Sequence, residues 1–148
     1  MREVQEIPEV VSQESADNAM LSEEVYKENG GNPVGWKAIA WSDKVPGASV
    51  AGYYGVAYQN NSTGEIVIAH RGTQLSDIGD LWSDLLLGTN VLPGQLSGAL
   101  KFIEAVKNNT GVGYSDIGHT GHSLGGAIAK LIGIATGSLD IWAYNSPK

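Results

Sequence analysis

The stretch TGHSLGG, residues 120–126, constrains the fold of this chain more than any other. Gly121, Ser123 and Gly125 fit the G-x-S-x-G pattern of a nucleophile elbow, a sharp turn in which a strand ends and a helix begins at once. The residue at its tip is strained, and we expect the two flanking glycines to crowd each other so closely that a Cβ on either would clash. The pattern predicts a strand before Ser123 and a helix after it. The alternative is a chance match in which Ser123 only caps the helix.

Hydrophobic periodicity and turn signals divide the rest of the chain into strands and helices. We predict strands over 36–41, 50–59, 65–70, 115–120 and 140–144, and helices over 16–28, 76–87, 95–108 and 124–136. Ser15 is the expected N-cap of the first helix. The third helix is expected to bury one apolar stripe, formed by Leu96, Leu100, Ile103 and Val106.

The order of these elements predicts an α/β fold. Residues 50–70 read as a β-hairpin, because a strong turn signal at 60–64 separates two apolar runs, and the second run is expected to be buried on both faces. From residue 65 onward, strands alternate with helices, which predicts a mostly parallel sheet extended by the antiparallel hairpin. We divide the chain into 1–49, a leader with a helix and a short strand, and 50–148, a partial catalytic domain. The last strand is expected to leave an unpaired sheet edge.

Composition and charge exclude several functions. The 148 residues carry 9 Lys and Arg against 16 Asp and Glu, a net charge of −7, so nucleic-acid binding is not expected. There is no cysteine, which excludes disulfides, thiolate metal sites and a cysteine nucleophile. No cluster of metal ligands is visible, and we expect neither metal nor cofactor. The polar N-terminus lacks the apolar core of a signal peptide, so the expected location is the cytoplasm, with signal-independent export left open.

Two further groups are candidates for the chemistry of Ser123. The backbone N–H of Leu124 would lie at the start of the new helix, where it is unpaired and can stabilise an oxyanion. Thr73, in the triplet Arg71-Gly72-Thr73 after a buried strand, would lie at the same sheet edge and can offer its N–H and hydroxyl. The alternative for Thr73 is an ordinary turn in which it caps a helix.

Four blocks of the sequence resemble class 3 (fungal-type) lipases, in the same order along the chain. They are IVIAHRGT at 66–73, DLWSDL at 80–85, TGHSLGG at 120–126 and WAYNSP at 142–147. The resemblance covers about residues 50–148 and implies an α/β-hydrolase-like fold. It further implies that Ser123 is the nucleophile and that Thr73 and Leu124 supply the oxyanion hole. Residues 75–86 would lie where those lipases carry a mobile lid, although their apolar side chains also suit a core-facing helix.

The family's catalytic aspartate and histidine lie well downstream of its serine, and their counterparts are not found here. No histidine follows Ser123, and the acid Asp140 precedes its strand, which places it at the opposite end of the sheet. His119 is expected to be buried, and His122 to pack beside the sheet. His70, at a strand end, is the remaining candidate for a general base. The sequence therefore predicts a hydrolase domain truncated after the strand that follows the elbow helix.

Three hypotheses remain open. The first is a carboxylic ester hydrolase of class 3 lipase type, acting on an ester or lipid through an acyl-enzyme and making interfacial contact with lipid. A missing C-terminal half or an oligomer would then complete it. The second is a catalytically silent module that binds a lipid or a partner protein. The third is a complete small hydrolase that uses His70 as its base.

Overall fold

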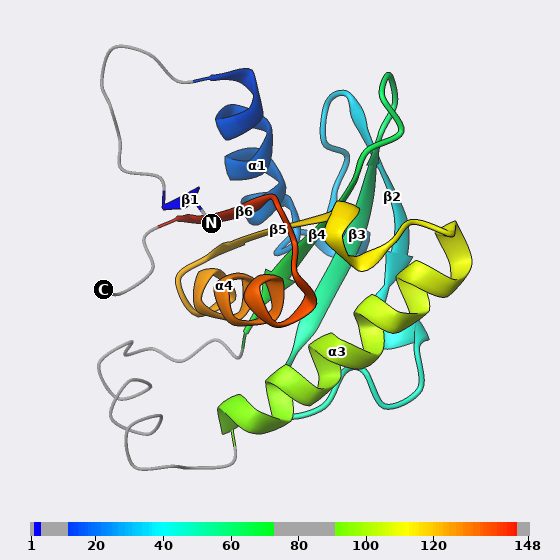
Figure 1. Ribbon diagram of the computed structural model, residues 1–148, viewed down its shortest axis with the longest axis vertical. Coiled ribbons are helices and arrows are strands. Elements are labelled where there is room, and N and C mark those ends of the chain that lie inside the picture. The colour runs from blue at the N-terminus through cyan, green and yellow to red at the C-terminus, as the bar shows by residue number, and fades with distance from the viewer. Residues whose placement is uncertain (1, 4–11, 73–90, 145–148) are drawn as a thin grey trace.

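The computed structural model describes residues 2–3, 12–72 and 91–144, in which a central sheet is covered by helices on both faces (Figure 1). Helix α1 (Gln13–Glu24) lies on one face, and α3 (Val91–Thr110) and α4 (Leu124–Thr136) lie on the other. The mixed α/β architecture confirms the predicted class. The predicted helix over 76–87, with the apolar segment 75–86, lies outside the described residues, as do Thr73 and residues 145–148.

The sheet has six strands in the order β1-β6-β5-β4-β3-β2. Their bounds are β1 Arg2–Glu3, β2 Trp36–Trp41, β3 Tyr54–Asn60, β4 Ile66–Arg71, β5 Ile117–His122 and β6 Ile141–Tyr144. Strands β4, β5, β6 and β1 run parallel, and β2, β3 and β4 pair antiparallel, as predicted for a parallel sheet with a hairpin at its side. The carboxyl ends of β4 and β5 therefore meet at one edge.

The hairpin of β3 and β4 follows from its turn. The side chain of Asn60 accepts hydrogen bonds from the backbone N–H groups of Ser62 (2.8 Å) and Thr63 (3.0 Å), and Gly64 takes a positive φ of 77°. These local bonds fix the register, so that Gln59 pairs with Ile66 and Tyr54 with Arg71. Strand β4 is buried on both faces up to its last residue, as its continuous apolar run predicts.

Three predictions about element boundaries and edges were wrong. Ser12, not Ser15, is the N-cap of α1, because the Ser12 hydroxyl accepts from the N–H of Ser15 (3.1 Å). The helix also ends at Glu24 rather than near residue 28, and by Lys27 the backbone is already extended (φ −85°, ψ 158°). The outer edge of β6 is not bare: β1 pairs with it, with Arg2 opposite Trp142. A two-residue strand leaves no periodic signal that sequence analysis could detect.

Helix α3 buries most of the predicted stripe, with Leu96 packed against the core beside Ile103 and Val106, but Leu100 is not part of it. Phe102, Ile103 and Val106 are fully buried, whereas Leu100 is 46% exposed. The buried residues face Ile66, Ile68 and other members of the core beneath α3 and α4. Helix α4 keeps its predicted bounds and ends at Gly137 in the left-handed conformation (φ 74°). No helix in the described part of the chain is both long and apolar enough to cross a membrane.

Two histidines are buried side by side beneath α3 and α4. The Tyr53 hydroxyl lies 2.8 Å from Nδ1 of His70, and Nε2 of His70 lies 2.8 Å from Nδ1 of His119. The two imidazole rings stack with centroids 5.1 Å apart. Burial, and secondarily the charge of His119, lowers the pKa of His70 well below its usual value, and burial lowers the pKa of His119 to about 3. Both rings are therefore neutral near pH 7.

Replacing a buried core side chain of α3 should cost far more than replacing its exposed neighbour. We expect Phe102→Ala to lower the free energy of unfolding by about 3–5 kcal/mol, because it leaves a cavity in the core beneath α3 and α4. Leu100→Ala, on the same helix, is the control and should cost less than about 1 kcal/mol. Urea denaturation measures both. Equal losses would contradict the burial assigned to α3.

The buried histidines should make the protein less stable in mild acid. Their pKa values are lowered on folding. The free energy of unfolding is therefore unaffected by these rings above about pH 6.5, the unfolded value, and decreases as the pH falls below it. His119→Gln keeps an amide beside His70 and removes one titrating ring. Between about pH 7.5 and pH 5, we expect wild type to lose about 2 kcal/mol more than this variant in urea denaturation. Identical pH dependence in both proteins would refute the assignment.

Candidate active site

Ser123 forms the tip of a tight turn between β5 and α4. Its φ of 59° and ψ of −121° lie in a region that residues other than glycine rarely adopt, and holding such a residue costs about 1–3 kcal/mol. The strand before it and the helix after it are both present, as the sequence predicts. The N–H of Ser123 donates to the carbonyl of Tyr144 (2.9 Å), and its own carbonyl accepts from the N–H of Ala127 (3.2 Å).

The side chain of Ser123 does not cap the helix. Ser123 stands at the N-cap position of α4 but makes no side-chain capping bond there. The interpretation of this serine as only a helix cap therefore lacks the hydrogen bond that would justify it. A strained backbone and a hydroxyl without a capping role are what a serine at a reactive turn requires.

Glycines around the turn permit backbone-to-backbone contact. A Cβ on Gly121 would overlap the carbonyl group of Gly125, which confirms the predicted crowding. A Cβ on Gly125 would overlap the carbonyl oxygen of His70, so the first turn of α4 lies directly against the end of β4. This second contact was not predicted, because it joins segments that are 55 positions apart in the sequence.

The end of β4 also packs against the first residue of α4. A Cβ on Gly72 would overlap the side chain of Leu124, which is buried. The N–H of Leu124 belongs to the first turn of α4, where N–H groups have no partner within the helix and the helix dipole favours negative charge. Thr73 follows Gly72 directly, but it lies outside the described residues. Of the two predicted oxyanion residues, the structure therefore places only Leu124 beside Ser123.

His70 and His119 do not form a catalytic pair with Ser123. Both ring nitrogens of His70 are engaged, one by Tyr53 and one by His119, and the ring is fully buried. His70 is therefore not placed to act as the general base, because its imidazole points into the core. His119 is buried as predicted, and its Nε2 has no hydrogen-bond partner among the described residues. His122, the last residue of β5, is half-buried.

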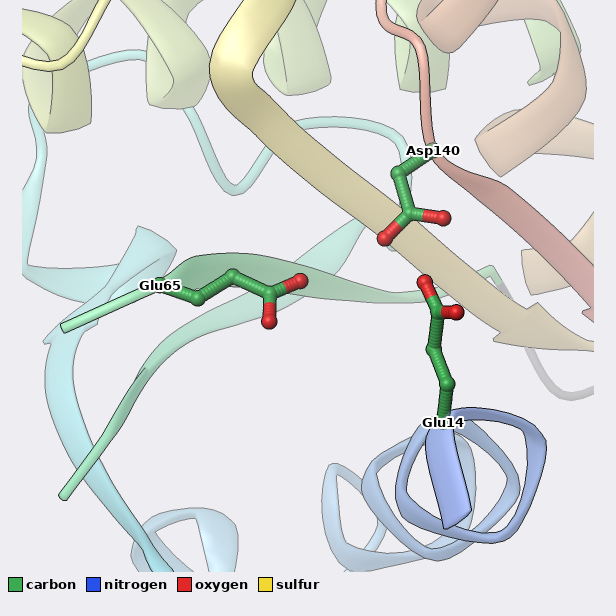
Figure 2. A group of neighbouring side chains, drawn as sticks. All are labelled: Glu14, Glu65 and Asp140. Carbon is green, nitrogen blue, oxygen red and sulfur yellow. The ribbon is translucent and has the colours of Figure 1, made fainter. Parts of the chain in front are cut away.

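Asp140 lies at the opposite edge of the sheet from Ser123, as its position before β6 predicts. Figure 2 shows its carboxylate together with those of Glu14, from α1, and Glu65, which immediately precedes β4. One oxygen from each lies within 4.8 Å of the others. Sequence reasoning missed this group because its members are scattered along the chain and only the fold brings them together.

The carboxylates of this acidic group interact with Trp142 and with one another. Asp140 accepts a hydrogen bond from the indole N–H of Trp142 (2.8 Å). Burial raises the pKa of Glu65, and the charges of Asp140 and Glu14 with a hydrogen bond to Asp140 raise it further. The group lies at the edge away from Ser123 and contributes no general acid to it.

Comparison with known proteins agrees with a lipid-cleaving family. A family model described as a Tle-like phospholipase domain, of phospholipase-like type, matches residues 17–145, a range that contains most of α1, the strands β2–β6 and the turn at Ser123. No curated protein and no solved structure matches the chain. Since the match covers most of the sequence, the chain belongs to the Tle-like phospholipase domain family, a family of the phospholipase and lipase type.

Proposed function

We propose that the chain is a serine hydrolase domain that cleaves carboxylic esters of phospholipids, with Ser123 as the nucleophile of an elbow in an α/β-hydrolase fold. The observation that carries this proposal is the positive φ of Ser123 at the tip of the turn from β5 to α4. Membership of a phospholipase-like family supports the substrate class. The four sequence blocks that resemble class 3 lipases support a mechanism of that type.

The proposed reaction proceeds through an acyl-enzyme. The Ser123 oxygen attacks the ester carbonyl carbon, and the negative charge moves to the carbonyl oxygen. The N–H of Leu124, together with Thr73, stabilises this oxyanion, and each such donor is typically worth about 3–4 kcal/mol in the transition state. The C–O bond to the alcohol then breaks, the lysophospholipid leaves with a proton, and water releases the fatty acid from Ser123.

The proposal requires a general base and an acid that the described residues do not place beside Ser123. His70 and His119 are hydrogen-bonded in the core, and Asp140 is at the far edge. We propose that these two groups reach Ser123 from polypeptide other than the described residues. Without its base, a serine triad loses several orders of magnitude in rate. Hydrolysis that relied on the described residues alone would therefore be slow.

A catalytically silent lipid-binding module is the second candidate. It is favoured by the hydrogen bonds of His70: both of its ring nitrogens are occupied, so this ring cannot activate Ser123. The two candidates differ in the reactivity of the serine hydroxyl. A strained serine beside an unpaired helix N–H reacts with an electrophile that mimics the acyl transition state, whereas a serine in a binding module does not.

A fluorophosphonate probe followed by mass spectrometry tests the proposal. We expect the probe to label Ser123 and labelling to vanish in Ser123→Ala. Ser115→Ala, which changes an exposed serine before β5, is the matched control and should be labelled like wild type. The same variants are compared for release of fatty acid from a short-chain phosphatidylcholine. Absence of label at Ser123 in folded protein would reject the nucleophile and favour the silent module.

A further inference from the structure

Arg71 is the last residue of β4 and lies at the sheet edge that carries Ser123. His70 pairs with Gly121 of β5, so Arg71 stands one step further along, level with the residue that precedes Ser123. Neighbouring strands lie about 4.8 Å apart, which places the Arg71 backbone close to the turn. The contact of Gly125 with the end of β4 brings the start of α4 to the same place.

Two tyrosines hold the guanidinium of Arg71. Its central carbon lies 4.5 Å from the ring centroid of Tyr54 and 5.8 Å from that of Tyr26. Tyr54 comes from β3, and Tyr26 follows α1, so the side chain of Arg71 is on the face of the sheet that α1 covers. Arg71 is half-buried, and Tyr26 is 36% exposed. The cation is therefore fixed by the protein yet open to solvent on one side.

Within the described residues, no carboxylate forms an ion pair with Arg71. Asp43 acts on the neighbouring Tyr54 and raises its pKa, after the larger effect of burial, but it makes no bond to the guanidinium. A guanidinium over an aromatic ring uses its flat face for that contact and keeps its N–H groups for acceptors in its plane. Arg71 thus has donors to offer to a bound anion.

The net negative charge of the chain means that an anion would bind only beside a local cation such as Arg71. With a net charge of −7, the protein repels anions in general, so an anion that reaches this edge needs a local partner. The fork of a guanidinium matches two oxygens of a phosphate, and such charge-assisted bonds are the stronger kind of hydrogen bond. In a glycerophospholipid, the phosphate lies only a few bonds from the acyl esters.

We propose that Arg71 binds the phosphate group of a phospholipid substrate and thereby positions an acyl ester at Ser123. The inference rests on the proposed function, since it supplies the residue that selects a phospholipid over an uncharged ester. Tyr54 and Tyr26 hold the guanidinium at the edge, and the bound phosphate completes its hydrogen bonds. Arg71 is a positioning residue and takes no part in bond breaking.

The test compares two substrates with equal acyl chains, a short-chain phosphatidylcholine and the corresponding diacylglycerol. Arg71→Gln should lower kcat/KM for the phospholipid at least about tenfold, the effect of losing hydrogen bonds to a charged group, while activity on diacylglycerol changes less than about twofold. Arg71→Lys keeps the charge without the fork and should fall between wild type and Arg71→Gln. Thermal unfolding of each variant checks that the fold is retained.

Lys107→Gln is the matched control, because Lys107 also lies over a tyrosine ring, 4.4 Å from that of Tyr114, but near the end of α3. It removes the same charge and should leave both activities unchanged. Equal losses on both substrates in Arg71→Gln, or no loss on either, would overturn the phosphate assignment. If wild type hydrolyses neither ester because the general base is not supplied, the binding measurement below decides the role of Arg71.

A binding measurement decides the role of Arg71 independently of catalysis. In Ser123→Ala, we expect sn-glycerol 3-phosphate to produce saturable NMR shifts at the rings of Tyr26 and Tyr54. Adding Arg71→Gln should abolish these shifts, and adding Lys107→Gln should preserve them. Shifts that persist without Arg71, or that never occur, would refute phosphate binding here. Equal affinity for inorganic phosphate would assign the site to free phosphate and reject the lipid headgroup.

Discussion

The contact between Gly125 and the carbonyl of His70 is the constraint on which the candidate site depends. Only a residue without a side chain lets the first turn of α4 lie against the backbone of β4. Gly121 approaches Gly125 in the same way, and Gly72 leaves room for Leu124. These close approaches draw the end of β4 and the turn after β5 together. The surrounding packing can then hold Ser123 in a conformation that would be unfavourable in a free chain.

Charged side chains of opposite sign lie at opposite ends of the strands. Arg71 lies at the edge of Ser123, whereas Glu14, Glu65 and Asp140 gather at the opposite edge. The face beneath α3 and α4 holds the neutral chain of Tyr53, His70 and His119, which satisfies buried polar atoms without introducing a charge. The buried imidazoles therefore belong to the core rather than to proton transfer.

Sequence patterns predicted those elements whose causes are local. The hairpin turn depends on Asn60 and Gly64. Helix α4 begins directly after the G-x-S-x-G turn and ends at Gly137, so local sequence patterns predict both elements. The cap of α1 was misassigned because two serines stand three positions apart and only one accepts the capping bond. Strand β1 was missed because two residues have no period, and the exposure of Leu100 depends on how α3 is rotated against the sheet.

The sequence by itself determined the turn at Ser123, since the glycines that flank it meet a steric requirement that acts within a few residues. It also determined the α/β class and the placement of Asp140 at the far edge. Only the tertiary structure decided what each polar side chain does. It turned His70 inward to Tyr53 and His119, and it set Arg71 between two tyrosines. The reason is physical: these partners come from different strands and helices, so strand pairing and helix packing select them, and no local pattern records the choice.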